Sequence, residues 1–401
     1  MANIMKPEFH FADRAIKLTS SAIREILKVT EKKEIISFAG GLPSPEGFPI
    51  EIVKDAFNKV LTENGKVALQ YGTTEGYTPL RQWIADEMNA SGSEINIDQI
   101  LIVSGSQQAL DLLGKILINE GDKILVENPS YLGALQSFGL YQPKYIPVPT
   151  DDGGLIPEHI DKETASNARF LYALPNFQNP TGRTLSLERR KELVKLMANL
   201  NIPIIEDDPY GELRYKGTPQ PSLLSLSKET GGTVIRLGTF SKVLAPGLRL
   251  GYVIAPVPII RKLVQAKQAS DLHTPTLTQM AVYEVIKDGF LQKHLPNVRD
   301  IYRTQVQCML KALEKEFPAG IQWTKPEGGM FLWITLPKHI DSTKLLEKAI
   351  VRNIAFVTGK PFFIAPSPEE NCTMRLSFAT VPEEKIVQGI SLLGQLIKEN
   401  L

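Results

Sequence analysis

Lys242 lies between two hydroxyl residues on one side and an arginine on the other. Thr239 and Ser241 precede it and Arg249 follows it, within the stretch GTFSKVLAPGLR. An amine in this setting can hold an aldehyde cofactor as a Schiff base, while hydroxyls and a guanidinium bind the phosphate of that cofactor. The alternative is an ordinary solvated loop lysine. The segment therefore predicts Schiff-base chemistry, provided that other parts of the chain supply the remaining groups.

Two further segments could bind the phosphate and the ring of such a cofactor. An apolar run turns through Gly105 into a helical pattern that begins near Ser106, and the free N–H groups and hydroxyl of a helix start can meet a phosphate. Asp207 and Tyr210 follow another apolar run. A carboxylate that faces a pyridine nitrogen keeps it protonated and makes the ring a stronger electron sink. Helix capping and an ordinary acidic turn are the alternatives.

Asn179 and Tyr131 also follow predicted strands. Asn179 lies in the exit PNFQNPTG, where its amide could reach a ring oxygen and where the bond to Pro180 could be cis. Tyr131, in ENPSY, could stack on a cofactor ring. A common turn composition and a half-buried packing tyrosine are the respective alternatives.

The elements that must position these residues form an alternating pattern of short apolar runs and amphipathic helices. The runs cover residues 100–103, 123–126, 145–148, 169–174, 202–205, 233–237 and 249–254, with helical stretches such as 107–117 and 187–200 between them. Seven such runs predict a mostly parallel, helix-covered sheet in an α/β fold. Ligands of such sheets collect at the carboxyl ends of the strands, where the polar residues described above fall.

The pattern changes after about residue 285. A long helical stretch leads to apolar runs at 328–335, 353–358 and 373–378 and then to a closing helix. We interpret residues 46–285 as a large cofactor-binding α/β domain, and residues 1–45 with 286–401 as a smaller α+β domain with an N-terminal segment that caps the substrate.

Composition excludes several classes of function. The 45 basic and 44 acidic residues leave no net field to recruit nucleic acid or an anionic membrane. No apolar stretch approaches membrane-spanning length, and no signal peptide is evident, so a cytoplasmic location is expected. The cysteines, Cys308 and Cys372, cannot build a disulfide framework and are expected to be buried thiols, and the 5 histidines show no metal-site spacing.

Taken together, in this order, the motifs resemble the class I/II aminotransferases of pyridoxal-phosphate fold type I, over nearly the whole chain. The similarity is strongest to the branch with 2-aminoadipate and kynurenine aminotransferases, through the motifs SAIREI at 21–26, FAGGLP at 38–43, QYG at 70–72, SGSQQ at 104–108, NPTG at 179–182, EDDPY at 206–210 and SKVLAPGLRLGY at 241–252.

The resemblance implies a role for each matching residue. Lys242 would carry pyridoxal 5'-phosphate and then move the proton between Cα and the cofactor, for which its pKa must be low. Asp207 would face the pyridine nitrogen, Tyr210 and Asn179 the ring hydroxyl, and Tyr131 the ring face. The phosphate would be held by Ser106, Gln107, Thr239, Ser241 and Arg249.

Substrate and subunit contacts are implied in the same way. Arg375 matches the arginine that binds the substrate α-carboxylate, since its planar fork suits that group. Tyr71 matches a tyrosine that reaches the phosphate in the neighbouring subunit's site, which implies a homodimer with shared sites. Arg24 and Gly40 would close over the substrate. Arg24 could pair with a distal carboxylate or swing out for aromatic and branched side chains, and an exposed helix arginine is the alternative.

The resulting expectation is a ping-pong aminotransferase that takes 2-aminoadipate, glutamate, aromatic or branched-chain amino acids, with 2-oxoglutarate as acceptor. A carbon–sulfur lyase of the same fold is the main alternative, because the cofactor stabilises any carbanion. A DNA-binding regulator would need a winged helix before the aminotransferase pattern. A nicotinamide-dependent dehydrogenase would need GxGxxG at the first strand–helix turn.

Overall fold

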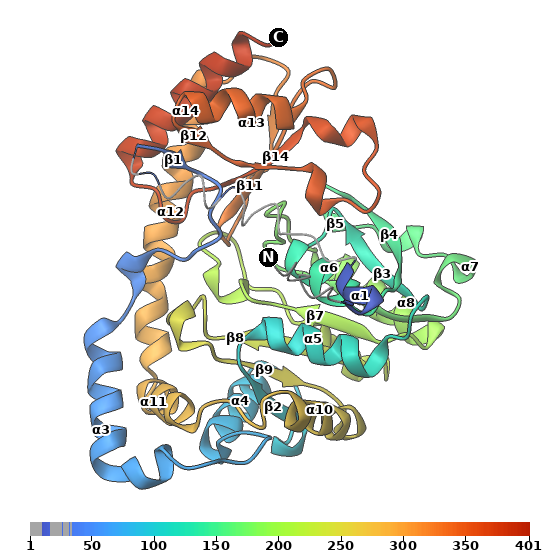
Figure 1. Cartoon of the computed structure of the whole chain (residues 1–401), viewed down its shortest axis with the longest axis vertical. Helices are drawn as coiled ribbons and strands as arrows, with labels where there is room; N and C mark the ends of the chain where they lie inside the picture. The colour runs from blue at the N-terminus through green and yellow to red at the C-terminus, as the bar shows by residue number, and fades with distance from the viewer. Residues whose placement is uncertain (1–9, 17–25, 27–31, 33) are drawn as a thin grey trace, which may run out of the picture.

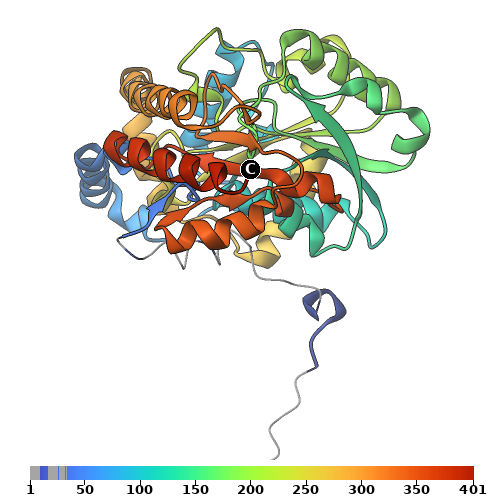
Figure 2. The same ribbon diagram turned by 90° about the horizontal axis from the view of Figure 1, so that it is seen from above.

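The structure is a computed structural model that describes residues 10–16, 26, 32 and 34–401. It contains a large sheet covered by helices and a second, smaller unit above it (Figure 1). Figure 2 shows α1 (Asp13–Ile16) apart from the folded body, and this helix buries no residue. The division of the chain near residues 46 and 285 stays a prediction.

The large sheet contains every strand that the apolar runs predict. Its eight strands, in spatial order, are β2 (Ile100–Val103), β9 (Gly251–Ile254), β8 (Val234–Thr239), β7 (Ile204–Asp207), β6 (Ala168–Ala173), β3 (Lys123–Asn128), β4 (Lys144–Asp151) and β5 (Gly154–Leu155). Strand β9 runs antiparallel to both of its neighbours, and β5 folds back on β4. The other pairs are parallel, so the expected mostly parallel sheet is confirmed. The sheet has one strand more than the seven expected, because the two-residue β5 is added at one edge.

Most of the strands are buried because helices cover both faces of the sheet. Besides α1, the α-helices among the described residues are α3 (Ile50–Ala68), α4 (Thr78–Ala90), α5 (Ser106–Leu117), α6 (Leu132–Gly139), α7 (Lys162–Ala165), α8 (Leu187–Leu200), α9 (Leu223–Leu226), α10 (Val257–Ser270), α11 (Thr276–Ile286), α12 (Phe290–Glu316), α13 (Ser342–Val351) and α14 (Glu383–Lys398). On β6, Phe170 and Tyr172 face a core with α5 and α6, whereas Leu171 faces a core with α8. This alternation is the period of two that a strand requires.

The smaller unit is built around an antiparallel sheet. Its order is β10 (Gln322–Trp323), β11 (Phe331–Thr335), β14 (Thr373–Ser377) and β13 (Val357–Thr358). Beside it, β1 (Ile36–Ser37) pairs in parallel with β12 (Ile354–Ala355), so an N-terminal segment does join the C-terminal part of the chain. The long helix α12 packs against α14, and the chain ends on the outer side of this unit (Figures 1 and 2).

The described residues also bear on membrane spans, metal sites and the cysteines. Within them, no helix is long and apolar enough to cross a bilayer, and no group of three or more His, Cys, Asp or Glu side chains could hold a metal ion. Cys308 and Cys372 are not joined in a disulfide. Cys372 is buried as expected, but Cys308 is only half-buried because it lies on α12 beside the start of α14, where its sulfur approaches the Glu383 carbonyl.

Candidate active site

A cavity of about 420 Å³ lies at the carboxyl ends of the parallel strands, between the two sheets. Several loops that follow strands reach it, together with β14 of the smaller sheet and the segment after β1. Its walls are Gly41, Leu42, Ser106, Gln107, Tyr131, Leu174, Asn179, Asp207, Pro209, Tyr210, Thr239, Ser241, Lys242, Pro246, Arg249 and Arg375. The structure thus brings together nearly all of the residues that the sequence motifs single out.

One end of the cavity is suited to an anion. Ser106 is the first residue of α5, so its N–H and hydroxyl lie at a helix N-terminus that favours negative charge. The preceding Gly105 has φ of 84°, and a Cβ there would lie 2.6 Å from Nη2 of Arg249. Only glycine therefore allows the guanidinium to approach this turn. The hydroxyl of Thr239 accepts the backbone N–H of Ser241 at 3.1 Å, which fixes these two hydroxyl-bearing residues relative to each other.

Lys242 is half-buried in the middle of the cavity. Its Nζ donates to the carbonyl of Gly41 at 2.9 Å and lies 5.8 Å from the ring centre of Tyr210. Burial, and then the positive charges of Arg375 and Arg249, lower the pKa of Lys242 to about 8. Among the described residues it has no carboxylate partner. The low pKa expected of a Schiff-base lysine is therefore present in this structure.

Asp207 is the last residue of β7, and only one of its two carboxylate oxygens has a hydrogen-bond partner among the described residues. Its side chain is 3% exposed, and Oδ2 accepts the hydroxyl of Tyr172 at 2.7 Å. Oδ1 is also buried but has no hydrogen-bond partner among the described residues. Burial raises the pKa of Asp207 to about 7, against the lowering effect of the Tyr172 hydrogen bond. A buried orphan oxygen of this kind costs stability until an N–H donor reaches it, and a protonated ring nitrogen would be such a donor.

Tyr210, Asn179 and Tyr131 surround the centre of the cavity. Tyr210 is buried, and its pKa is raised mainly by that burial, although a hydrogen bond with Asn179 opposes the rise. The Asn179–Pro180 bond is cis, as the sequence suggested. Tyr131 caps α6 and is half-buried, and burial raises its pKa to about 12. All three side chains thus keep neutral hydrogen-bonding groups near Lys242.

Arg375 projects from β14 as a buried guanidinium without an acid partner among the described residues. It is 1% exposed, and its Nη1 and Nη2 donate to Asn179 Oδ1 and the Ala39 carbonyl, each at 2.8 Å. Its Cζ lies 4.3 Å from the ring centre of Phe331, while Nε has no partner among the residues described. Burial lowers the pKa of Arg375 to about 10. A buried fork that lacks its counter-charge is suited to a carboxylate ligand.

Two expected residues are not in the cavity wall, and a third cannot be placed. Tyr71 is 78% exposed and packs edge-on against His273, so it does not reach the site of its own chain. Gly40 is half-buried next to Gly41, which does line the cavity. Arg24 lies outside the described residues. Gln107 lines the wall, but its amide donates to the Gly133 carbonyl at 2.9 Å.

Some important residues were missed by sequence reasoning. Tyr172 holds Asp207, and its only signal is a hydroxyl in the run 169–174, which is otherwise apolar after Arg169. Glu127, the second-last residue of β3, is buried and accepts the Leu174 N–H at 2.9 Å, and burial raises its pKa to about 8. The rings of Phe331 and Phe362 lie beside the Arg375 guanidinium, with their centres 4.3 and 5.4 Å from its Cζ. Sequence patterns could only mark these two rings as core residues.

The donor set fits pyridoxal 5'-phosphate. A cationic, hydroxyl-rich end suits the phosphate, the orphan Oδ1 of Asp207 suits the ring N–H, and Lys242 lies between them with a lowered pKa. The cavity also leaves Arg375 free for a second, carboxylate-bearing molecule.

Comparison with known proteins agrees with this geometry. The sequence model of the family "Aminotransferase class I and II" matches residues 33–393. Aromatic-amino-acid aminotransferase 1 of Thermococcus litoralis is 45% identical, over 98% of this chain and 95% of its own length. The 2-aminoadipate transaminase of Thermus thermophilus is also 45% identical, over 97% and 96% of the two chains.

Solved structures show the same relationship. The α-aminoadipate aminotransferase of Thermus thermophilus, complexed with N-(5'-phosphopyridoxyl)-L-leucine, superposes with a TM-score of 0.90 at 44% identity, over 97% of each chain. The kynurenine aminotransferase of Pyrococcus horikoshii superposes with a TM-score of 0.92 at 44% identity, over 98% of this chain and 97% of that one.

Proposed function

Because this chain belongs to the class I and II aminotransferases and depends on pyridoxal phosphate, we propose that it moves the amino group of 2-aminoadipate, glutamate, or aromatic and branched-chain amino acids to 2-oxoglutarate by a ping-pong mechanism. The observation that carries the proposal is that one cavity holds both Lys242, whose pKa is lowered, and the buried fork of Arg375, which has no acid partner among the described residues. The lyase alternative is not favoured, since relatives at 45% identity are named aminotransferases.

The cofactor would be held at three places. Its phosphate would lie against Ser106, Ser241 and Arg249, with Gln107 and Thr239 completing that wall. Asp207 would accept the ring N–H through Oδ1, and Tyr210 and Asn179 would hold the ring hydroxyl. When bound, the cofactor withdraws electrons from the Cα of the amino acid, which makes a Cα proton removable.

Lys242 would then carry that proton. A lysine with a pKa of about 8 has a substantial neutral fraction at pH 7 to 8, which a base requires. The Tyr210 ring lies beside its Nζ, and Gly41 accepts one of its N–H groups, so the amine is positioned while still able to move. The roles assigned to these side chains are part of the proposal.

Arg375 would bind the α-carboxylate and so fix the orientation of Cα. Its fork is already aimed by Asn179 and Ala39 and flanked by Phe331, so little ordering is needed on binding. Ligand binding would supply the counter-charge that the buried guanidinium lacks.

The names of the relatives support the proposed range of substrates, and one packing contact supports the segment proposed to cover the substrate. The relatives include an aromatic-amino-acid aminotransferase and a 2-aminoadipate transaminase. Ile26, two residues after Arg24, packs on the cluster that contains Trp333 and Phe362, and Phe362 contacts Arg375. The segment that carries Arg24 and Gly40 would therefore cover the substrate, with Arg24 pairing a distal carboxylate.

We further propose a homodimer with shared active sites. Tyr71 is exposed in a single chain and would contact the cofactor phosphate of the partner subunit. A cytoplasmic location is also part of the proposal, since two cysteines cannot build the disulfide framework typical of secreted domains.

The first experiment is the visible absorbance of the purified protein with L-glutamate or L-2-aminoadipate and no oxo acid. The proposal expects the cofactor band to bleach with either donor and to return on addition of 2-oxoglutarate. Lys242→Ala should bind cofactor but show neither change. A band that neither donor bleaches would overturn the proposed substrates, and release of pyruvate and ammonia without an acceptor would indicate a lyase.

The role of Arg24 has a separate test. Arg24→Ala removes the proposed partner of a distal carboxylate, so kcat/KM for 2-aminoadipate should fall about tenfold or more relative to that for leucine. The comparison is made by steady-state assays with both donors at saturating 2-oxoglutarate. Equal losses for the two substrates would remove Arg24 from the substrate site.

A further inference from the structure

Behind the anion-binding end of the cavity lies an ion pair that the aminotransferase reaction does not use, between a buried lysine and an aspartate whose side chain is 31% exposed. Lys267 of α10 has a fully buried side chain, and its Nζ contacts both oxygens of Asp271, at 2.8 and 2.9 Å. Such a pair is an inefficient source of stability, because removing the Lys267 ammonium from water offsets much of its attraction to the partly exposed carboxylate. Its presence raises the question of what the pair holds in place.

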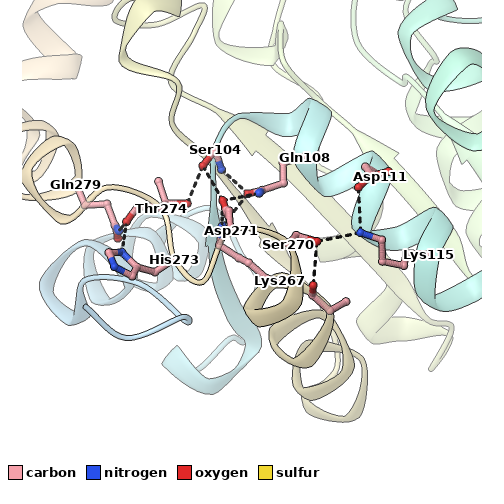
Figure 3. A network of polar contacts seen from close by, with 11 residues as sticks. Ser104, Gln108, Asp111, Lys115, Lys267, Ser270, Asp271, His273, Thr274 and Gln279 are labelled. Atoms are coloured by element: carbon pink, nitrogen blue, oxygen red, sulfur yellow. Dashed lines mark hydrogen bonds and ion pairs between the residues drawn. The ribbon is translucent and has the colours of Figure 1, made fainter. Parts of the chain in front are cut away.

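The pair holds the side chain of Gln108 in one orientation. Gln108 Oε1 accepts from Lys267 Nζ at 2.8 Å, and Gln108 Nε2 donates to Asp271 Oδ2 at 2.6 Å (Figure 3). A flipped amide would place a donor against the ammonium and an acceptor against the carboxylate. The two charges therefore decide which end of the amide points toward Ser104.

Gln108 in turn holds Ser104, the residue before the turn that starts α5. Gln108 Oε1 also accepts the backbone N–H of Ser104 at 2.8 Å. The Ser104 hydroxyl lies 3.2 Å from Thr274 Oγ1 and 3.4 Å from Asp271 Oδ2. Its carbonyl accepts from Arg249 Nη2 at 3.4 Å. Every polar group of Ser104 is thus fixed by the pair, by its neighbour Thr274 or by the phosphate-binding arginine.

The position of Ser104 determines where the anion site lies. Gly105 and Ser106 follow it directly, and Ser106 and Arg249 both line the anion end of the cavity. A shift of Ser104 would move the N–H groups at the start of α5 relative to the guanidinium, and a misplacement of about 1 Å is enough to weaken a preorganised site strongly.

We propose that the Lys267–Asp271 pair is a positioning element for the cofactor phosphate, which acts through Gln108 and Ser104 on the turn that begins α5. The inference rests on the proposed placement of the phosphate at Ser106 and Arg249. Neither Lys267 nor Asp271 lines the cavity, so neither is a catalytic residue.

The test measures binding of two probes to the full-length protein freed of cofactor. The first, 4'-deoxypyridoxine 5'-phosphate, cannot form a covalent bond with Lys242, and the second, 4'-deoxypyridoxine, lacks the phosphate. Lys267→Met and Asp271→Asn should each weaken binding of the phosphorylated probe by about tenfold, as expected for a lost charge-assisted hydrogen bond. Binding of the probe without phosphate should change less than twofold.

Lys115→Met is the matched control. Lys115 also joins α5 to α10, through Ser270 Oγ at 2.9 Å, but has no contact with Gln108 or Ser104 among the described residues (Figure 3). It should leave binding of both probes unchanged. In a Gln108→Ala background, Asp271→Asn should have a smaller effect than in the wild-type protein, because only its direct contact with the Ser104 hydroxyl then remains.

The outcomes separate the inference from the proposed function. Unchanged affinity for the phosphorylated probe in both variants, or equal losses for both probes, would overturn the positioning role. Should Lys267→Met fail to fold, the nearly isosteric Asp271→Asn decides. If the wild-type protein itself bound both probes equally, the proposed phosphate site would be wrong, whatever the variants did.

Discussion

Single atoms without partners define this site. Oδ1 of Asp207 and Nε of Arg375 are buried and lack hydrogen-bond partners among the described residues, although the groups carry opposite charges. Such atoms are rare in protein interiors, because each costs about 1–3 kcal/mol or more when left unpaired. They mark the positions where a ring N–H and a carboxylate would complete the structure, so the two residues should destabilise the protein until their ligands bind.

Asp207→Asn tests this cost through its pH dependence. Burial raises the pKa of Asp207 from 3.8 to about 7. Between these values the folded protein keeps a proton that the unfolded chain has lost, so stability falls as pH rises through this window, and the penalty is complete above pH 7. In cofactor-free protein at pH 8, the variant should therefore raise the free energy of unfolding, by up to about 4 kcal/mol.

The measurement is urea unfolding at pH 8 and near pH 4, where the gain should disappear. The cofactor-loaded variant should nevertheless lose turnover. Asp55→Asn, at an exposed position on α3, is the control and should change neither quantity. A variant that gains no stability at pH 8 would show that the Asp207 carboxylate is not penalised.

Tyr172→Phe tests the residue that holds Asp207. Loss of the 2.7 Å hydrogen bond should raise the pKa of Asp207 further and move the acidic limb of the kcat profile to higher pH. Turnover at pH 7 should fall about ten- to hundredfold, as for other hydrogen bonds to charged groups. Tyr145→Phe removes a hydroxyl that donates to the Leu135 carbonyl away from the cavity, so it should leave the profile in place.

At the scale of elements, the site is a set of loops whose strands were predictable from the sequence. Apolar runs located β2, β3, β4, β6, β7, β8 and β9, since nearly all of these runs are buried on both faces, although β4 is largely exposed. The two-residue β5 carries too short a pattern to detect. The hydrogen bond from Tyr172 to Asp207 depends on the register of β6 against β7, which periodicity does not specify.

One contact between elements should be especially sensitive to substitution. Phe177, two residues before Asn179, has φ of 47° and lies under Gly328 and Gly329. A Cβ on Gly328 would lie 2.2 Å from Phe177 Cζ. Gly328→Ala should cost about 1–3 kcal/mol in stability, as overpacked cores do, and should lower turnover by displacing Asn179.

Chemical denaturation and steady-state kinetics would measure these two effects. Gly65→Ala is the control, because nothing lies within 4 Å of its added methyl group and it sits in helix α3. It should be neutral or slightly stabilising. Full stability and activity of Gly328→Ala would mean that the two loops separate easily.

At the scale of the whole molecule, many of the exposed large apolar side chains lie along one stretch of the chain. On α3 and the segment after it, they include Ile50, Ile52, Leu61, Val67, Leu69 and Tyr71. Exposed apolar surface, where it gathers, typically marks a protein interface. A two-fold dimer through this surface would bury these side chains. Tyr71 of each chain would then face the cavity of the partner subunit.

Hybrid dimers test whether Tyr71 acts across the interface. A Lys242→Ala subunit paired with a Tyr71→Phe subunit has one site with both wild-type residues if Tyr71 serves its partner. The mixed dimer should then show about half of wild-type activity per dimer, as two independent sites predict. Activity no higher than that of the Tyr71→Phe homodimer would place Tyr71 in its own chain's site. Differently tagged subunits allow the hybrid to be purified before assay.

The hydrogen bond from Arg375 to the Ala39 carbonyl joins residues that are 336 positions apart. The residues of the same chain that would hold phosphate and ring lie between 106 and 249, well before the arginine in the sequence. During translation, the ribosome therefore adds the cofactor-binding segments before it adds the residue proposed to bind the substrate carboxylate. A nascent chain that stalls before residue 375 would lack that fork, so the ability to hold an amino acid would arise after the ability to hold the cofactor.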